Sequence, residues 1–187
     1  MSNLRLASRY AKSLVDLAVE QQQLDAVYAD IKVLQSICIT NSDFVAMLKS
    51  PIISSDKKEK IVIAVTSDKI GKLTAAFLTL LINKSREYSL PEIVKAFIDQ
   101  YNKINDIHPV KLTTAVPVSD QVKNAILDKI RSTTSMQKIE LETVVKDELI
   151  GGFTLEVGDS FVDASILRDL NDVKKQFLNN DFIQSMR

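Results

Sequence analysis

Three of the four glycines in this 187-residue sequence fall close together, at Gly151, Gly152 and Gly158. Clustered glycines can cradle phosphate, because their backbone N–H groups reach an anion without side chains in the way. A phosphate loop, however, needs lysine followed by serine or threonine at a helix start, or a G-x-G-x-x-G pattern. Neither pattern is present, and residues 153–157 alternate as a strand does. We therefore expect these glycines to shape the backbone and to bind no nucleotide.

The predicted backbone roles of this stretch are specific. The glycine pair is expected to permit a bulge or a close backbone approach where one strand meets the next. Gly158 and Asp159 fit a two-residue hairpin turn, with the glycine at positive φ. Asp163 or Ser165 is then expected to cap the last helix.

The other residues that could take part in catalysis or metal binding lack the partners that such a site needs. Cys38 is the only cysteine, so the chain has no internal disulfide or cysteine-based zinc site, and its apolar helical face predicts an inert buried thiol. His108, the only histidine, lies beside Pro109 and is predicted to lie in a linker. The carboxylates of Asp147 and Glu148 fit a solvated turn better than acid–base catalysis. We predict no catalytic residue, no metal site and no cofactor.

Composition narrows the class of protein. Apolar residues make up 45% and charged residues 26% of the chain, as in ordinary globular proteins. The 24 basic and 24 acidic residues cancel, which argues against nucleic-acid binding, because that needs a basic surface. No apolar run approaches the ~20 residues that span a bilayer. The N-terminus has no apolar signal core, so we expect a cytoplasmic protein without membrane insertion.

The hydrophobic period changes partway along the chain and divides it into two predicted domains. Residues 1–106 show helical spacing throughout and predict an N-terminal six-helix bundle. Residues 107–187 predict a small α/β domain with a mixed sheet and two helices, so the fold class is α+β overall. Residues 107–109 are taken as the link. The six helices are expected at about 3–21, 24–40, 42–50, 54–65, 73–86 and 89–105, and the first two strands at 110–116 and 138–143.

Two of the predicted helices carry more apolar surface than one core contact needs. Apolar and alanine side chains cover an arc of roughly 180° on the first helix, at about 100° per residue, and surround the fifth almost completely. Ala7, Ala11 and Ala18 form a strip of small residues where another helix could approach. Complete burial inside the bundle would explain the apolar surface of the fifth helix. A groove for a partner helix would explain the apolar surface of both helices. The pattern alone leaves these two explanations open.

Three segments, in this order, resemble the delta subunits of F-type ATP synthase, the bacterial counterparts of the mitochondrial oligomycin-sensitivity-conferring protein. The first is RYAKSL, which departs from the family's R-Y-A-x-A-L at its serine. The second is an arginine-containing link between the fifth and sixth helices, and the third is a glycine-rich C-terminal signature. The segments contain Arg9, Arg86, Gly151, Gly152, Gly158, Asp159 and Asp163.

The resemblance implies a non-catalytic stator, or peripheral-stalk, subunit present in a single copy. Such a subunit links the catalytic F1 head to the membrane-anchored b subunits, at the cytoplasmic face of the plasma membrane, so that rotor torque drives ATP synthesis. Its helical domain would bind the N-terminal helices of the α subunits, and its second domain the C-terminal ends of the b subunits. The alternative is a cytoplasmic helical adaptor or regulator, including an RNA-associated one. The resemblance implies an α-subunit groove between the first and fifth helices, with Ala7, Tyr10, Ala11, Leu14, Phe77 and Leu80 as candidates.

Overall fold

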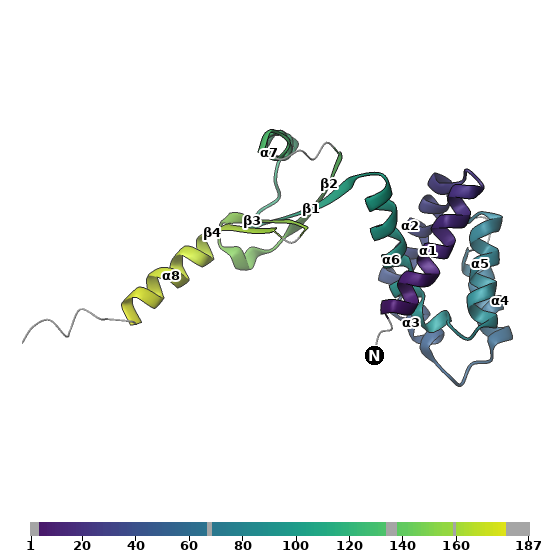
Figure 1. Cartoon of the computed structure of the whole chain (residues 1–187). Coiled ribbons are helices and arrows are strands. Elements are labelled where there is room, and N and C mark those ends of the chain that lie inside the picture. Colours follow the sequence, from purple (N-terminus) through teal and green to yellow (C-terminus); the bar gives the residue numbers. More distant parts are fainter. Residues whose placement is uncertain (1–3, 67–68, 134–137, 159, 179–187) are drawn as a thin grey trace, which may run out of the picture. The chain divides into compact units, whose positions relative to one another are not determined.

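The chain is an α+β protein that divides into two compact units, Met1–Ile104 and Asn105–Arg187 (Figure 1). The computed structural model describes residues 4–66, 69–133, 138–158 and 160–178. The sequence pattern places the division after residue 106.

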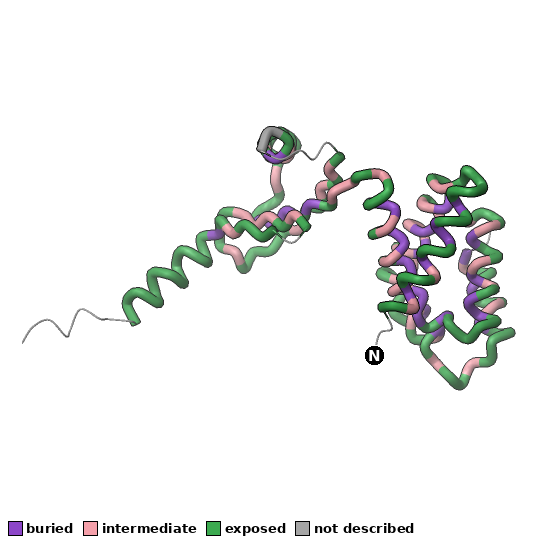
Figure 2. The backbone as a smooth tube through the Cα atoms, viewed as in Figure 1, coloured by how far each residue is buried: buried purple, intermediate pink, exposed green. Residues whose placement is uncertain are grey.

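All the secondary structure in the described part of the first unit is helical, and α1 packs most extensively against α6. Ala7, Ala11 and Ala18 are buried on α1, and such small side chains let two helix axes approach closely. Figure 2 shows that the buried residues of these helices gather where the helices face one another. In order, the elements are α1 (Leu4–Glu20), α2 (Leu24–Thr40), α3 (Ser42–Lys49), α4 (Ser55–Thr66), α5 (Lys72–Asn83), the 3-10 helix η1 (Glu87–Ser89) and α6 (Leu90–Ile104).

Helix α5 ends at Asn83, whereas the sequence pattern extends it to about Arg86. Ser85 adopts a left-handed conformation with φ of 52°. Its N–H donates to the Ile82 carbonyl at 2.9 Å, and the Arg86 N–H donates to the Leu81 carbonyl at 2.8 Å. This pair of bonds closes a helix when one residue is left-handed. Because that residue is serine and not glycine, the sequence carries no obvious stop signal.

A buried ion pair joins three elements of this unit. Lys58 on α4 donates from Nζ to Glu87 Oε1 in η1 at 2.7 Å and to the Leu48 carbonyl of α3 at 2.9 Å. A buried charge is costly unless it is paired and hydrogen-bonded. The pair therefore fixes η1, an element that the sequence pattern does not predict, against α3 and α4.

An aromatic pair joins α2 to α6. The rings of Tyr28 and Tyr101 stack with centroids 3.8 Å apart and planes inclined by 11°. Tyr101 donates its hydroxyl to Asp25 Oδ1 at 2.8 Å, and Lys32 Nζ lies 5.4 Å from the Tyr28 centroid. Burial, followed by the bond to Asp25, raises the pKa of Tyr101 to about 12. The last turn of α6 is thereby held against the first turns of α2.

The second unit contains a four-stranded mixed sheet in the order β2-β1-β3-β4. Strands β1 and β2 are parallel, whereas β3 is antiparallel to both β1 and β4. Its described elements are β1 (Ile107–Thr114), α7 (Asp120–Thr133), β2 (Lys138–Val145), the 3-10 helix η2 (Asp147–Leu149), β3 (Gly152–Val157), β4 (Ser160–Ser165) and α8 (Ile166–Leu178).

The prediction that residues 107–109 form a linker is wrong. They open β1, where His108 pairs with Ile139 of β2. Proline cannot donate to a ladder and is usually confined to edges. Here β3 pairs with β1 only from Val110 onward, so Pro109 stands where β1 has a neighbouring strand on one side.

The two adjacent glycines differ in what holds them. Gly152 has φ of 76°, and a Cβ there would lie 2.1 Å from the Ala164 carbonyl oxygen on the paired strand. A Cβ on Gly151 would meet only the Ile166 side chain, 2.5 Å from Cδ1. The close backbone approach predicted for the pair is therefore required at Gly152.

The turn that follows β3 agrees with the expected hairpin. Val157 pairs with Ser160, and Gly158 has φ of 56°. Asp159 lies outside the described residues. At the far end of β4, Ser165 caps α8, because its Oγ accepts the Arg168 N–H at 3.2 Å.

Asp163, the other predicted cap, orders the capping residue instead. Its Oδ1 accepts the Ser165 N–H at 2.9 Å. Hydrogen bonds from the Ser165 side chain and backbone lower the pKa of Asp163.

Candidate interaction surfaces

Three of the six candidate groove residues are buried on α1. Ala7, Ala11 and Leu14 lie on the side of the helix that packs inside the unit, and Ala11 is 0% exposed. They present no surface to a partner in this structure, so the expectation that the small-residue strip lines an open groove is corrected. The strip serves helix packing within the unit.

The flank of α1 beside that buried side stays accessible. Tyr10 is half-buried, as is Leu6, and Leu17 is exposed. At 100° per residue these three side chains share one edge of the helix. Among the α1 candidates, Tyr10 is the one that remains available to a partner.

Helix α5 is buried along one side only. Thr74, Leu78, Leu81 and Ile82 face inward, whereas Leu80 is 46% exposed and Phe77 is half-buried. Complete burial, one of the two explanations for its apolar sequence, therefore does not apply. Leu73, Phe77 and Leu80 follow one another at spacings of four and three and form an accessible flank.

The two flanks belong to helices that share a neighbour. Both α1 and α5 pack against α2. Apolar edges on two such helices are what an amphipathic partner helix needs if it is to lie in a groove between them.

Helix α8 provides a second apolar surface. Across Ile166–Leu178 no residue is buried, and Phe177 is 80% exposed. Ile166, Leu170, Val173 and Phe177 recur at spacings of four, three and four, which is the seam of a coiled coil. Exposed apolar side chains in a continuous stripe are typical of an interaction site.

The charged side of α8 is internally paired. Asp172 lies 3.7 Å from Arg168 Nε through one carboxylate oxygen and 3.7 Å from Lys175 Nζ through the other. Exposed pairs of this kind contribute little stability. They mark the solvent face, and the apolar stripe is the face left for a partner.

The two arginines of the sequence signature lie at the surface. Arg9 is exposed on α1, and its carbonyl accepts the Ser13 hydroxyl at 3.0 Å. Ser13, where the chain departs from the family pattern, thus bonds back to its own helix. Arg86 follows α5 and donates from Nη1 to the Tyr88 hydroxyl at 3.1 Å.

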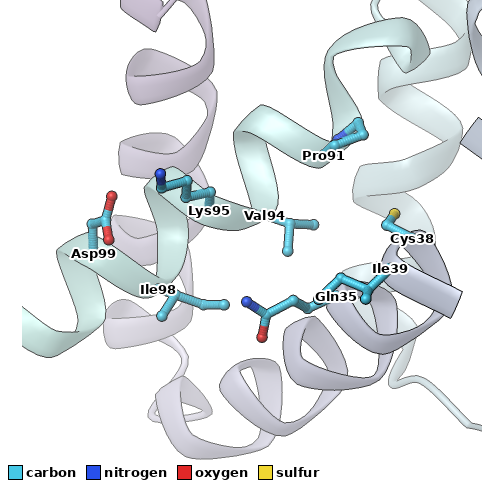
Figure 3. A pocket seen from close by; sticks show the side chains of 8 residues that line it. All are labelled: Gln35, Cys38, Ile39, Pro91, Val94, Lys95, Ile98 and Asp99. Atoms are coloured by element: carbon cyan, nitrogen blue, oxygen red, sulfur yellow. The ribbon is translucent and has the colours of Figure 1, made fainter. Parts of the chain in front are cut away.

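The cysteine lies at a pocket of about 360 Å³ between α2 and α6 (Figure 3). Burial, followed by the charge of Glu92, raises the pKa of the Cys38 thiol. A thiol with a raised pKa stays protonated at neutral pH and is a poor nucleophile. The walls are mainly apolar, with Val94 and Ile98 on α6, and Figure 3 shows Lys95 and Asp99 along the same helix.

The described residues contain neither a metal cluster nor a single membrane-spanning helix. In these parts of the chain, no three histidine, cysteine or acidic side chains gather closely enough to hold a metal ion. No single described helix is long and apolar enough to cross a membrane; α2 and α3 together meet the length and composition criteria but are bent by 96°.

The chain matches a known protein family along nearly its whole length. The family model described as ATP synthase delta (OSCP) subunit matches residues 6–177. An ATP synthase subunit delta from Cytophaga hutchinsonii is 36% identical over 177 residues, which are 95% of this chain and 96% of that protein. A chloroplastic ATP synthase delta chain from Chlamydomonas reinhardtii is 31% identical over 172 residues, 91% of this chain and 78% of that protein.

A solved structure also resembles most of the chain. A chain of the Toxoplasma gondii mitochondrial ATP synthase hexamer, determined by cryo-electron microscopy, aligns with a TM-score of 0.71 and 25% identity. The alignment covers 92% of this chain and 97% of that one.

Proposed function

The chain belongs to the ATP synthase delta (OSCP) subunit family, and from that membership we propose how its two units serve the complex. It is a non-catalytic subunit of the peripheral stalk. As a stator it links the catalytic F1 head to the membrane-anchored b subunits, so that rotor torque drives ATP synthesis. It is therefore part of a membrane-associated complex, and we propose that it acts in a single copy at the cytoplasmic face of the plasma membrane.

The first unit is proposed to work as a six-helix bundle that binds the N-terminal helices of the α subunits. The flanks of α1 and α5 that carry Tyr10, Phe77 and Leu80 support this assignment, because they are apolar and accessible. A partner helix lying between them would cover the edges that the bundle leaves open.

The second unit is proposed to bind the C-terminal ends of the b subunits through α8. The observation that carries this assignment is the exposed stripe from Ile166 to Phe177 with coiled-coil spacing. That spacing favours a helical partner with its own apolar seam. Two separate surfaces on one chain suit a part that must hold a head and a stalk together, since the two affinities combine.

A titration of the full chain with two synthetic peptides tests this division. One peptide covers the N-terminal helix of the cognate α subunit, and the other covers the C-terminal segment of the b subunit. Leu170→Asp places a charge in the seam of an already exposed helix and should weaken b-peptide binding roughly thirtyfold. The same variant should bind the α peptide as the unaltered chain does.

Asn171→Asp is the matched control, because it adds the same charge to α8 outside the stripe. It should leave both affinities unchanged. Unchanged b-peptide affinity in Leu170→Asp would refute the assignment of α8.

A further inference from the structure

An aspartate on α2 caps the N-terminus of α5. Asp30 Oδ2 accepts the Gly71 N–H at 2.8 Å and the Thr74 hydroxyl at 2.6 Å. Thr74 is fully buried and Asp30 is half-buried. One carboxylate oxygen thus binds both the residue that precedes α5 and a side chain in its first turn.

The first turn of α5 has no local substitute for this cap. Gly71 occupies the N-cap position without a side chain, and the first turn contains no acidic residue. Helix N-termini leave N–H groups unpaired and favour negative charge. Asp30 supplies both the acceptor and the charge from another helix, across a sequence separation of 41 residues.

The capped turn is also where the accessible flank of α5 begins. Leu73 lies between the two residues that Asp30 binds, and Phe77 follows one turn later. Because α2 also packs against α1, a bond from α2 to the start of α5 sets where this flank stands within the bundle.

We propose that Asp30 is a positioning residue for partner binding, which holds α5 on α2 so that the flanks of α1 and α5 keep the spacing a docked helix requires. This role rests on the proposed α-subunit groove. It predicts that loss of the Asp30–Thr74 contact weakens binding in a chain that is still folded.

The experiment measures the affinity of the full chain for the synthetic α-subunit peptide, at a temperature where circular dichroism shows each variant to be folded. Asp30→Ala removes the acceptor, and Thr74→Val removes the hydroxyl while keeping the side-chain shape. Both should raise Kd by up to roughly fivefold, because a helix cap contributes about 1 kcal/mol to keeping the first turn formed and the partner binds the formed turn. Thr74→Ser keeps the hydroxyl and should restore binding to within about twofold of the unaltered chain.

Asp99→Ala is the control, because Asp99 is an exposed aspartate on α6 and should leave Kd unchanged. Amide hydrogen exchange reports position separately. In Asp30→Ala the N–H groups of Ala75 and Ala76 should exchange faster, while those of α6 should not change.

The possible results separate the two proposals. If the unaltered chain does not bind the peptide, the groove is refuted and this role with it. If the unaltered chain binds and Thr74→Val binds equally well, the groove stands and the positioning role is overturned. Should Asp30→Ala fail to fold, the pair Thr74→Val and Thr74→Ser decides the question.

Discussion

At the scale of single residues, the two adjacent glycines provide the sharpest contrast. Gly152→Ala places a Cβ 2.1 Å from a backbone oxygen at positive φ, so it should destabilise the second unit by on the order of 3 kcal/mol. Gly151→Ala meets only the end of the Ile166 side chain and should cost about 1 kcal/mol or less. Denaturant melts of the two variants measure the difference. Equal midpoints would show that the close approach at Gly152 does not constrain the sheet.

Neighbouring positions on α1 should separate folding from binding. Ala11 is fully buried, so Ala11→Leu should overpack the bundle and lower its stability by ~1–3 kcal/mol. Tyr10 is half-buried on the accessible flank, so Tyr10→Ala should weaken α-peptide binding by ~2 kcal/mol with a smaller effect on the melting midpoint. Paired melts and peptide titrations check both. Retained affinity in Tyr10→Ala would remove it from the groove.

The same two residues show how far the sequence predicts the site. Helical spacing correctly makes the α1 face apolar, but a helical wheel cannot distinguish a partner from the protein's own α6. Alanines suit packing against α6 and packing against a partner helix equally well, since both require two helices to approach closely. Only the packed structure turns Ala11 inward and leaves Tyr10 at the edge.

At the scale of helices and strands, the hydrophobic period and the structural propensities of the residues predict most elements. They predict the ends of those elements less well. The sequence does not predict that β1 starts at Ile107, because a histidine and a proline look like a linker when the pairing strands are unknown. The end of α5 is predicted too late, because Ser85 adopts the left-handed conformation that glycine usually takes at a helix end. The cap of α5 cannot be predicted from a local pattern, because Asp30 is distant from α5 in the sequence.

The contact between α2 and α6 gives a pH-dependent prediction. The pKa of Tyr101 is raised in the folded chain to about 12, from an ordinary value of about 10, because its neutral hydroxyl is buried and bonded to Asp25. Stability from this group is therefore complete below about pH 10 and is lost as the pH rises through about 12. Urea melts between these pH values should show the loss, and Tyr101→Phe should abolish that part of the pH dependence. An identical decline in Tyr101→Phe would assign it to other groups.

At the scale of the whole molecule, the two units should be separable. Each has its own packed interior, with Phe97 and Ile93 buried in the first and Val110 and Leu112 in the second. A fragment of residues 1–104 should fold as a helical protein and bind the α peptide with the affinity of the full chain. It should not bind the b peptide. A folded fragment without affinity for the α peptide would show that the helices alone do not form the site.

The covalent path between the units has a mechanical consequence. Helix α6 ends at Ile104 and β1 begins at Ile107, so only Asn105 and Asp106 lie between the last helix of the first unit and the first strand of the second. Each residue spans at most about 3.5 Å when extended, so the chain from Ile104 to Ile107 is fully extended at roughly 10 Å. The pull then reaches the last turn of α6, where Tyr101 is stacked on Tyr28. Because this part of the chain can lengthen so little, a load on it should fall on the folded elements at its two ends.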